Sequence, residues 1–191
     1  MDRTAPAPSA APLVGRVVAW AVAGALGGAG CLVGDHLHVA YGVLFYPHPA
    51  VWQQAWWVFP LFFFATLSVL LGVPLLYKGA PSETPVRAAA GDFGAFLAAY
   101  AFSALASPWP DVVLGVLLVA WLARALRGMP RGLMAFCGVV AVLGTGFEIG
   151  LSGAGGFSYV HPDFLGVPRW LPALYLHAAL AGASAAPVVN G

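Results

Sequence analysis

Charged residues are scarce in this sequence. Of its 191 residues only 8% are Asp, Glu, Lys or Arg, whereas 61% are hydrophobic, and the mean hydropathy is +0.86. A soluble domain carries about 25% charged residues, so this chain cannot cover a water-facing surface. The composition excludes a cytosolic enzyme and a disordered regulator, and it predicts an integral membrane protein.

Basic clusters and cysteines are scarce as well. The net charge is +1 and Lys and Arg form no continuous run, so the electrostatic footprint of a nucleic-acid-binding protein is missing. Cys31 and Cys137 both lie inside apolar runs, which indicates small buried residues rather than a disulfide or a metal cluster. The abundance of Gly, Pro and Ala, with Arg strongly favoured over Lys, is typical of a GC-rich genome. We therefore expect a bacterial protein of the cytoplasmic membrane.

Long apolar runs make up most of the sequence. A membrane-spanning helix needs about 20 apolar residues. By this criterion the sequence predicts one all-α domain over residues 1–191, a six-helix transmembrane bundle with spans at about 13–34, 52–77, 88–106, 111–125, 132–151 and 167–189. The polar and aromatic connection Asp35–Val51, with prolines at two positions, is expected to be interfacial or re-entrant. No internal repeat is apparent, which disfavours an inverted-repeat transporter.

The basic residues lie on one side of these predicted spans. Arg169 is the exception, and the others precede the first span or lie in the connections after the second and fourth spans: Arg3, Arg16, Lys78, Arg87, Arg124, Arg127 and Arg131. Under the positive-inside rule both termini are cytoplasmic. The opposite, outer face then carries His36, His38, His48, His161 and Asp163.

Small residues recur four positions apart in the first and last spans. Such pairs allow close helix–helix contact, either between copies of a chain or within one bundle. Packing within one bundle is the commoner use, and a homo-oligomer contact is the alternative. The pairs are Gly24 with Gly28, Gly30 with Gly34, and Ala178 with Gly182.

Glu148 is the one carboxylate well inside a predicted span. A carboxyl group in hydrocarbon costs about 2 to 3 kcal/mol or more, so it indicates a function by default. Thr145, Ala141 and Cys137 share its helical face, which is small and weakly polar. A purely structural glutamate, bonded to a neighbouring helix, explains the pattern equally well.

Metal binding and catalysis receive little support. Asp35, His36 and His38, with His48 nearby, could ligate a metal, but their helical phase is poor and no further ligand is specified. No Ser/His/Asp or Cys/His set shares a face, so no nucleophile is indicated. We expect a binding protein without a metal or cofactor other than a bound lipid, and no enzyme.

Two strings are more specific than an aromatic belt at the membrane interface. One reads Ala55-Trp56-Trp57-Val58-Phe59-Pro60, and the other combines Tyr159, Pro162-Asp163-Phe164-Leu165 and Trp170-Leu171-Pro172. Both resemble the INSIG (insulin-induced gene) family of sterol-responsive membrane proteins, whose members carry Ala-Trp-Trp-Val-Pro-Pro and Tyr-x-x-Pro-Asp-Phe-Leu followed by Trp-Leu-Pro. Six spans with cytoplasmic termini are also this family's arrangement.

The resemblance implies a lipid-binding sensor. Eukaryotic members, in the endoplasmic reticulum, bind oxysterols and then retain the SREBP cleavage-activating protein, and they engage HMG-CoA reductase. The aromatic residue that lines the family's sterol site corresponds to Phe96, with Tyr100 and Ser103 on the same helical face. One departure concerns the partner contact, because the family's Asp after a Trp pair is replaced by Trp121-Leu122-Ala123-Arg124.

A bacterial member would hold a lipid that bacterial membranes supply. Diacylglycerol, with two chains and one small hydroxyl head, suits a sparsely polar pocket, and a hopanoid or carotenoid-type isoprenoid is the sterol-shaped alternative. A polytopic membrane protein and a second copy of the chain are possible partners, and a small transporter or channel with Glu148 as its ion or proton site is the alternative function. The predicted ligand-binding residues are Gln53, Gln54, Trp56, Trp57, Phe96, Tyr100, Ser103, Trp121, Thr145 and Glu148.

Overall fold

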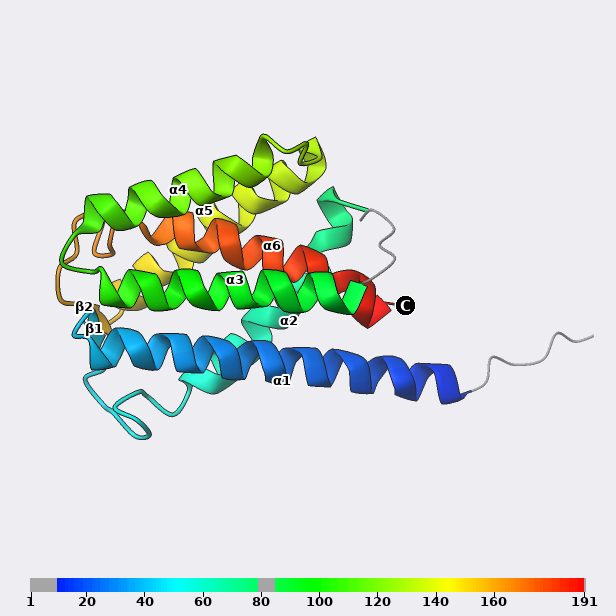
Figure 1. Ribbon diagram of the computed structural model, residues 1–191. Helices are drawn as coiled ribbons and strands as arrows, with labels where there is room; N and C mark the ends of the chain where they lie inside the picture. Colours follow the sequence, from blue (N-terminus) through cyan, green and yellow to red (C-terminus); the bar gives the residue numbers. More distant parts are fainter. Residues whose placement is uncertain (1–9, 79–84, 191) are drawn as a thin grey trace, which may run out of the picture.

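The computed structural model is a bundle of six helices and describes residues 10–78 and 85–190, with side chains from Val14 onward (Figure 1). Five of the helices are long and apolar enough to cross a membrane, and the chain is an integral membrane protein. The fourth has 16 residues, fewer than a typical span, so its crossing stays a prediction. The elements are α1 (Ala10–Ala40), β1 (Leu44–Phe45), α2 (Val58–Leu76), α3 (Pro85–Leu105), α4 (Pro110–Ala125), α5 (Arg131–Gly153), β2 (Ser158–Tyr159) and α6 (Leu171–Asn190).

The first helix is longer than the sequence predicted. It continues past Gly34 to Ala40, because the polar residues that were expected to end it, Asp35 and His38, are 4% and 1% exposed and find buried partners. The first connection therefore starts at Tyr41 rather than at Asp35. The second helix begins at Val58 instead of Trp52, after a tight turn.

The helices pack as two long pairs, α1 along α2 and α3 along α6, with α5 on the other side of α6 (Figure 1). We call the end of the bundle with β1 and β2 the strand end, and the opposite end, where α1 begins and α6 finishes, the terminal end. One buried cluster lies toward the strand end around Trp170 and Leu171, and a second surrounds Leu70, Phe136 and Leu180.

The paired glycines bring helices of one chain together. A Cβ atom on Gly24 would lie 2.8 Å from the Phe63 ring in α2, and one on Gly34 would lie 2.6 Å from the Tyr100 ring in α3. The same holds for Gly182, where a Cβ would lie 2.3 Å from Val69. These small residues therefore serve packing inside the bundle, the commoner of the two uses considered above.

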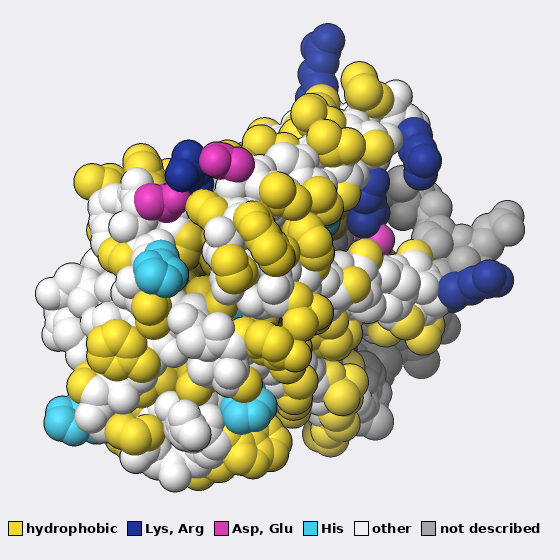
Figure 2. All heavy atoms as spheres, turned by 60° about the vertical axis from the view of Figure 1, so that its left-hand side comes forward, with side chains coloured by type: hydrophobic (Ala, Val, Ile, Leu, Met, Phe, Trp, Pro, Cys, Tyr) yellow, Lys and Arg dark blue, Asp and Glu magenta, His cyan; other side chains and the backbone are white. Residues whose placement is uncertain are grey.

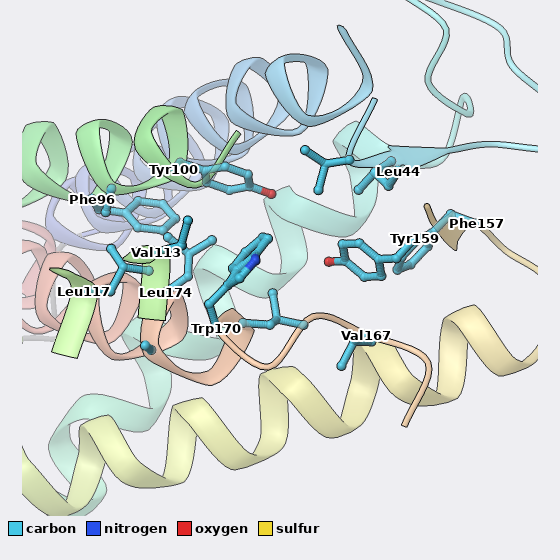
Figure 3. Close-up of a cluster of buried hydrophobic side chains, with 14 of the residues drawn as sticks. Leu44, Phe96, Tyr100, Val113, Leu117, Phe157, Tyr159, Val167, Trp170 and Leu174 are labelled. Carbon is cyan, nitrogen blue, oxygen red and sulfur yellow. The ribbon is translucent and has the colours of Figure 1, made fainter. Parts of the chain in front are cut away.

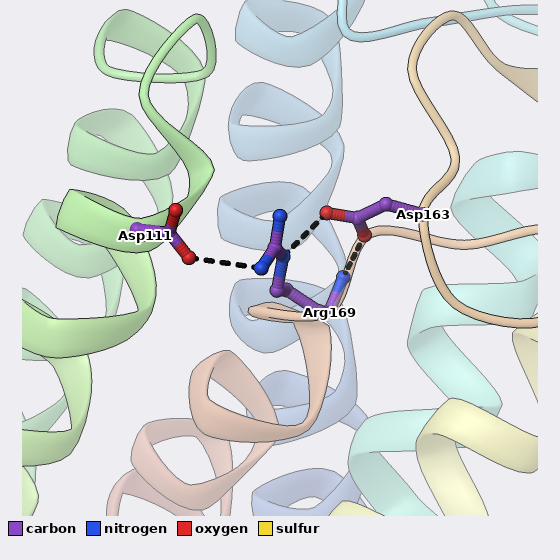
Figure 4. A network of polar contacts seen from close by, with 3 residues as sticks. All are labelled: Asp111, Asp163 and Arg169. Atoms are coloured by element: carbon purple, nitrogen blue, oxygen red, sulfur yellow. Dashed lines mark hydrogen bonds and ion pairs between the residues drawn. The ribbon is translucent and has the colours of Figure 1, made fainter.

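Lys and Arg side chains gather away from most of the His side chains (Figure 2). At the terminal end Arg124 forms a 2.7 Å ion pair with Asp92, which also accepts a hydrogen bond from Ser184, so α3, α4 and α6 are joined there. At the strand end Arg169 contacts Asp163 and Asp111 at 2.6 and 2.9 Å (Figure 4). This separation agrees with the predicted topology, although the side of the membrane stays a prediction, and Arg3 lies outside the described residues.

The chain contains an internal repeat, and the expectation of none was wrong. The segment α1–β1–α2 recurs as α5–β2–α6, and the end of the first helix and the start of the second are shifted by the same number of residues. In the two copies the first helix ends at Ala40 or Gly153, and the second begins at Val58 or Leu171. The sequences of the two copies agree at only a few positions, and their longest shared string is Tyr-x-His-Pro, at 46–49 and 159–162, which explains why hydropathy alone did not reveal the duplication.

Backbone conformation and strand register follow the same repeat. Positive φ angles occur at equivalent positions: Gly42 and Gly155 after the first helix, and Trp52 and Leu165, at 51° and 49°, in the turn before the second. The antiparallel strands pair Phe45 with Ser158, which are equivalent positions of the two copies. The helices α1 and α5 run in the same direction (Figure 1). The two copies are therefore related by a pseudo-twofold axis that is parallel to the bundle and passes between Phe45 and Ser158.

Candidate functional site

A cavity of about 670 Å³ lies between α1, α2, α3, α5 and α6 and is lined mainly by aliphatic and aromatic side chains. On α1 its lining extends from Ala19 to Asp35, which corresponds to roughly 24 Å of helix. The hydrocarbon core of a bilayer is about 30 Å thick, so the cavity follows most of a membrane's apolar depth. Its polar groups are concentrated at the strand end.

Asp35 in α1 is the first of two carboxyl groups in the cavity lining. Its Oδ2 accepts a hydrogen bond from the Tyr46 hydroxyl at 2.8 Å and one from Gln54 Nε2 at 2.7 Å. The tight turn through Trp52 and Gln53 directs Gln54 toward α1, where its Nε2 also donates to the Leu32 carbonyl. The Asp35 side chain is thus held by residues that follow it in the chain.

Glu148 in α5 is the second carboxyl group. Its Oε2 accepts from the Tyr159 hydroxyl at 2.5 Å, and its Oε1 accepts from the Tyr175 hydroxyl at 2.6 Å. One donor comes from strand β2 and the other from α6, so the side chain joins three elements at the strand end. Hydrogen bonds to a charged or chargeable acceptor in a dry site are among the stronger ones in proteins.

The tyrosines outside the helices are held as hydrogen-bond donors. Burial raises the pKa of Tyr46, and the charges of Asp35 and Glu148 raise it further. Burial likewise raises the pKa of Tyr159, with Glu148 as the next cause. A phenol whose pKa is raised keeps its proton at neutral pH, so both hydroxyls donate to the carboxyl groups beside them.

Aromatic rings form much of the remaining wall. Phe96 and Tyr100 of α3 pack edge to face, with ring centroids 5.6 Å apart. Figure 3 shows the hydroxyls of Tyr100 and Tyr159 directed toward each other across the space beside Trp170. Within the described residues the Tyr100 hydroxyl has no hydrogen-bond partner, although the side chain is only 8% exposed. The wall therefore presents the unpaired Tyr100 hydroxyl to the cavity.

The structure brings four of the predicted ligand-binding residues into the cavity lining: Trp57, Phe96, Tyr100 and Glu148. Three others are buried outside the lining: Gln54, Ser103 and Thr145. Trp121 packs against the second buried cluster, whereas Gln53 and Trp56 lie on the surface, Trp56 being 74% exposed. The cavity lining also contains Asp35, Tyr46, Tyr159 and Tyr175, which were not predicted; the repeated Tyr-x-His-Pro string was the signal for two of them.

Ser103 and His38 meet, but not as a catalytic pair. His38 Nε2 lies 2.9 Å from Ser103 Oγ, and the serine hydroxyl donates to the Tyr100 carbonyl at 2.8 Å. Because Ser103 is fully buried and its proton is engaged, this contact ties α1 to α3 rather than preparing a nucleophile. Within residues 10–78 and 85–190 no three His, Cys, Asp or Glu side chains are grouped to hold a metal.

Comparison with solved structures gives a relationship over nearly the whole chain. A crystal structure of MvINS, a mycobacterial Insig homolog from Mycobacterium vanbaalenii, superposes with a TM-score of 0.77 and 28% sequence identity, covering 91% of this chain and 95% of that one. The chain is an Insig homologue. The motifs at the starts of α2 and α6 predicted this membership of the Insig family correctly.

A crystal structure of a cross-linked trimer of MvINS matches this Insig homologue with the same TM-score, identity and coverage. No protein-family model and no curated protein matches the chain. The relationship to the mycobacterial Insig homolog therefore rests on the similar fold together with the motifs.

Proposed function

We propose that this Insig homologue is an intramembrane lipid-binding protein that holds one neutral lipid, diacylglycerol or a sterol- or isoprenoid-like lipid, in the cavity. The observation that carries the proposal is the cavity itself, about 670 Å³ with a mainly apolar wall and its carboxyl groups and tyrosines at one end. A lipid gains little from transfer between bilayer and cavity, so affinity depends on fit and on a few buried hydrogen bonds. This lining provides both.

The protein acts by binding rather than by catalysis and reports lipid occupancy through self-association or through a polytopic membrane partner. The trimer of the mycobacterial relative supports self-association. Arg124, paired with Asp92, stands where the family carries the acid used for partner contact, which disfavours the eukaryotic mode of partner retention. We place the protein in a bacterial cytoplasmic membrane, with six spans and both termini in the cytoplasm.

Native mass spectrometry of gently purified protein, followed by identification of co-purifying lipids, tests the proposal. We expect one discrete neutral lipid at about one molecule per chain. A mixture that mirrors the bulk phospholipid composition would contradict a selective cavity. Exchange of the bound lipid against added dioleoylglycerol would then show whether the cavity is accessible at all.

The internal repeat favours one alternative, a small transporter or channel. Transporters are often built from repeats, including parallel ones related by an axis along the membrane normal, with the substrate site at the repeat interface. Glu148 would then be the ion or proton site. Flux measured in liposomes, lost in the Glu148→Gln variant, would favour this alternative, and its absence in the wild-type protein would remove it.

A further inference from the structure

The polar end of the cavity is itself a product of the internal repeat. Asp35 and Glu148 occupy equivalent positions in the two copies, and so do Tyr46 and Tyr159. In each copy the tyrosine follows its acid by 11 residues and donates to one carboxyl oxygen. The surrounding wall is paired in the same way, for example Leu61 with Leu174 and Ala65 with Ala178. The two carboxyl groups are therefore related by the pseudo-twofold axis within one cavity.

The two copies differ at one hydrogen bond. Tyr175 donates to the second oxygen of Glu148, Oε1, but the equivalent position in the first copy is Phe62, which has no hydroxyl. Gln54 does not replace this bond, because it donates to Oδ2, the oxygen that Tyr46 already contacts. Asp35 Oδ1 is consequently left without a hydrogen-bond partner among the described residues, in a side chain only 4% exposed.

Tyr100 provides an independent second observation. Its hydroxyl also lacks a partner in the described part of the chain, its side chain lines the same cavity, and it is directed into the space between α3 and β2 (Figure 3). The fully enclosed polar atoms without a partner in the described residues are Gln54 Oε1, Trp121 Nε1 and Thr145 Oγ1; Asp35 Oδ1 and the Tyr100 hydroxyl are not among them, so both are accessible from the cavity. An acceptor oxygen and a hydroxyl, both unpaired and both in the cavity lining, indicate where a polar group of a ligand would bind.

The charges around this position define the kind of head group. Asp35 and Glu148 are the acidic residues of the described lining, and it contains no Lys, Arg or His. Repulsion between like charges is strong in a medium of low dielectric constant. A phosphate or carboxylate head would therefore be disfavoured, whereas a hydroxyl or a protonated amine can donate to a carboxyl oxygen.

We propose that the cavity selects lipids whose head donates a hydrogen bond to Asp35 Oδ1, a hydroxyl or a primary amine, and rejects anionic heads. This inference rests on the proposed lipid-binding function and specifies its ligand class. In the first copy the ligand donates to Asp35 Oδ1, just as in the second copy the Tyr175 hydroxyl donates to Glu148 Oε1. Tyr100 can then donate to a ligand oxygen from the other side.

The test uses four ligands that share one hydrocarbon chain: oleyl alcohol, oleylamine, oleyl methyl ether and oleyl phosphate. Their binding to the detergent-solubilised full-length protein is measured by native mass spectrometry in competition with dioleoylglycerol. We expect the alcohol and the amine to bind about tenfold or more tightly than the ether, which lacks a donor, and than the phosphate.

Phe62→Tyr is the decisive variant, since it supplies from the protein the hydroxyl that the first copy lacks. We expect it to remove the preference for alcohol over ether while keeping the fold. Phe64→Tyr, at a residue 63% exposed and outside the lining, adds the same hydroxyl as a matched control and should keep that preference. Asp35→Asn should abolish the preference for the amine over the ether.

The outcomes separate the two proposals. If alcohol, ether and phosphate bind the wild-type protein equally, the assignment of the head group is wrong but lipid binding in the cavity stands. If Phe62→Tyr leaves the preference unchanged, Asp35 Oδ1 is not the acceptor. If neither dioleoylglycerol nor any of the four ligands binds, both proposals fail.

Discussion

The Tyr159 hydroxyl donates a 2.5 Å hydrogen bond to Glu148 Oε2, joining strand β2 to α5. Since β2 also pairs with β1, this bond connects the short sheet at the strand end to the carboxyl group inside the cavity. Tyr46, which directly follows β1, makes the equivalent connection to Asp35. The sheet and the polar end of the cavity are therefore one hydrogen-bonded unit.

Removing the hydroxyl of Tyr159 should destabilise the protein measurably. We expect Tyr159→Phe to lower the free energy of unfolding by about 1 to 3 kcal/mol, because a buried carboxyl oxygen loses its donor. Unfolding in mixed micelles with increasing denaturing detergent measures the change. Tyr41→Phe, at a residue 53% exposed, is the matched control and should leave stability within about 0.5 kcal/mol. Equal effects of the two variants would show that the bond contributes nothing.

The close contact at Gly34 should not tolerate a methyl group. In Gly34→Ala the new Cβ would lie 2.6 Å from the Tyr100 ring, so α1 and α3 must separate or the ring must move. We expect destabilisation of about 1 to 3 kcal/mol and weaker lipid binding. Gly94→Ala, in α3 with nothing within 4 Å of the added atom, should be neutral or stabilising. Unaltered stability of Gly34→Ala would count against this packing.

Neighbouring tryptophans before α2 should behave differently. Trp57 lines the cavity, as does Phe96, whereas Trp56 is 74% exposed and outside the lining. We expect Trp57→Ala and Phe96→Ala to reduce lipid occupancy in native mass spectra with the fold retained, and Trp56→Ala to leave occupancy unchanged. Global unfolding of Trp57→Ala and Phe96→Ala would instead assign both residues a purely structural role.

Membrane orientation can be read from the accessibility of single cysteines. With Cys31 and Cys137 replaced by Ala, His48→Cys lies at the strand end and Arg127→Cys at the terminal end. The positive-inside rule predicts that a membrane-impermeant thiol reagent added to intact cells labels only the cysteine at position 48. Labelling of position 127 alone would invert the topology while leaving the fold intact.

The sequence predicted the helical bundle and the family well, because long apolar runs and aromatic strings are local signals. Burial of Asp35 was not predictable in this way. A polar residue after Gly34 suggests a helix end, and only the donors Tyr46 and Gln54, brought back by a turn with positive φ angles, make its burial favourable. Glu148 was recognised as unusual from its position alone, but its two tyrosine partners depend on tertiary structure.

Each buried acid precedes its hydrogen-bond donors in the chain, which bears on how the protein is made. Asp35 leaves the ribosome before Tyr46 and Gln54, and Glu148 before its two tyrosines. We therefore expect each carboxyl group to stay near the membrane surface during insertion, where water can solvate it, until the following segment supplies its hydrogen-bond donors. Because β1 pairs with β2, we expect the nascent protein to pass through a stage, before β2 has been translated, in which the cavity is open at its polar end.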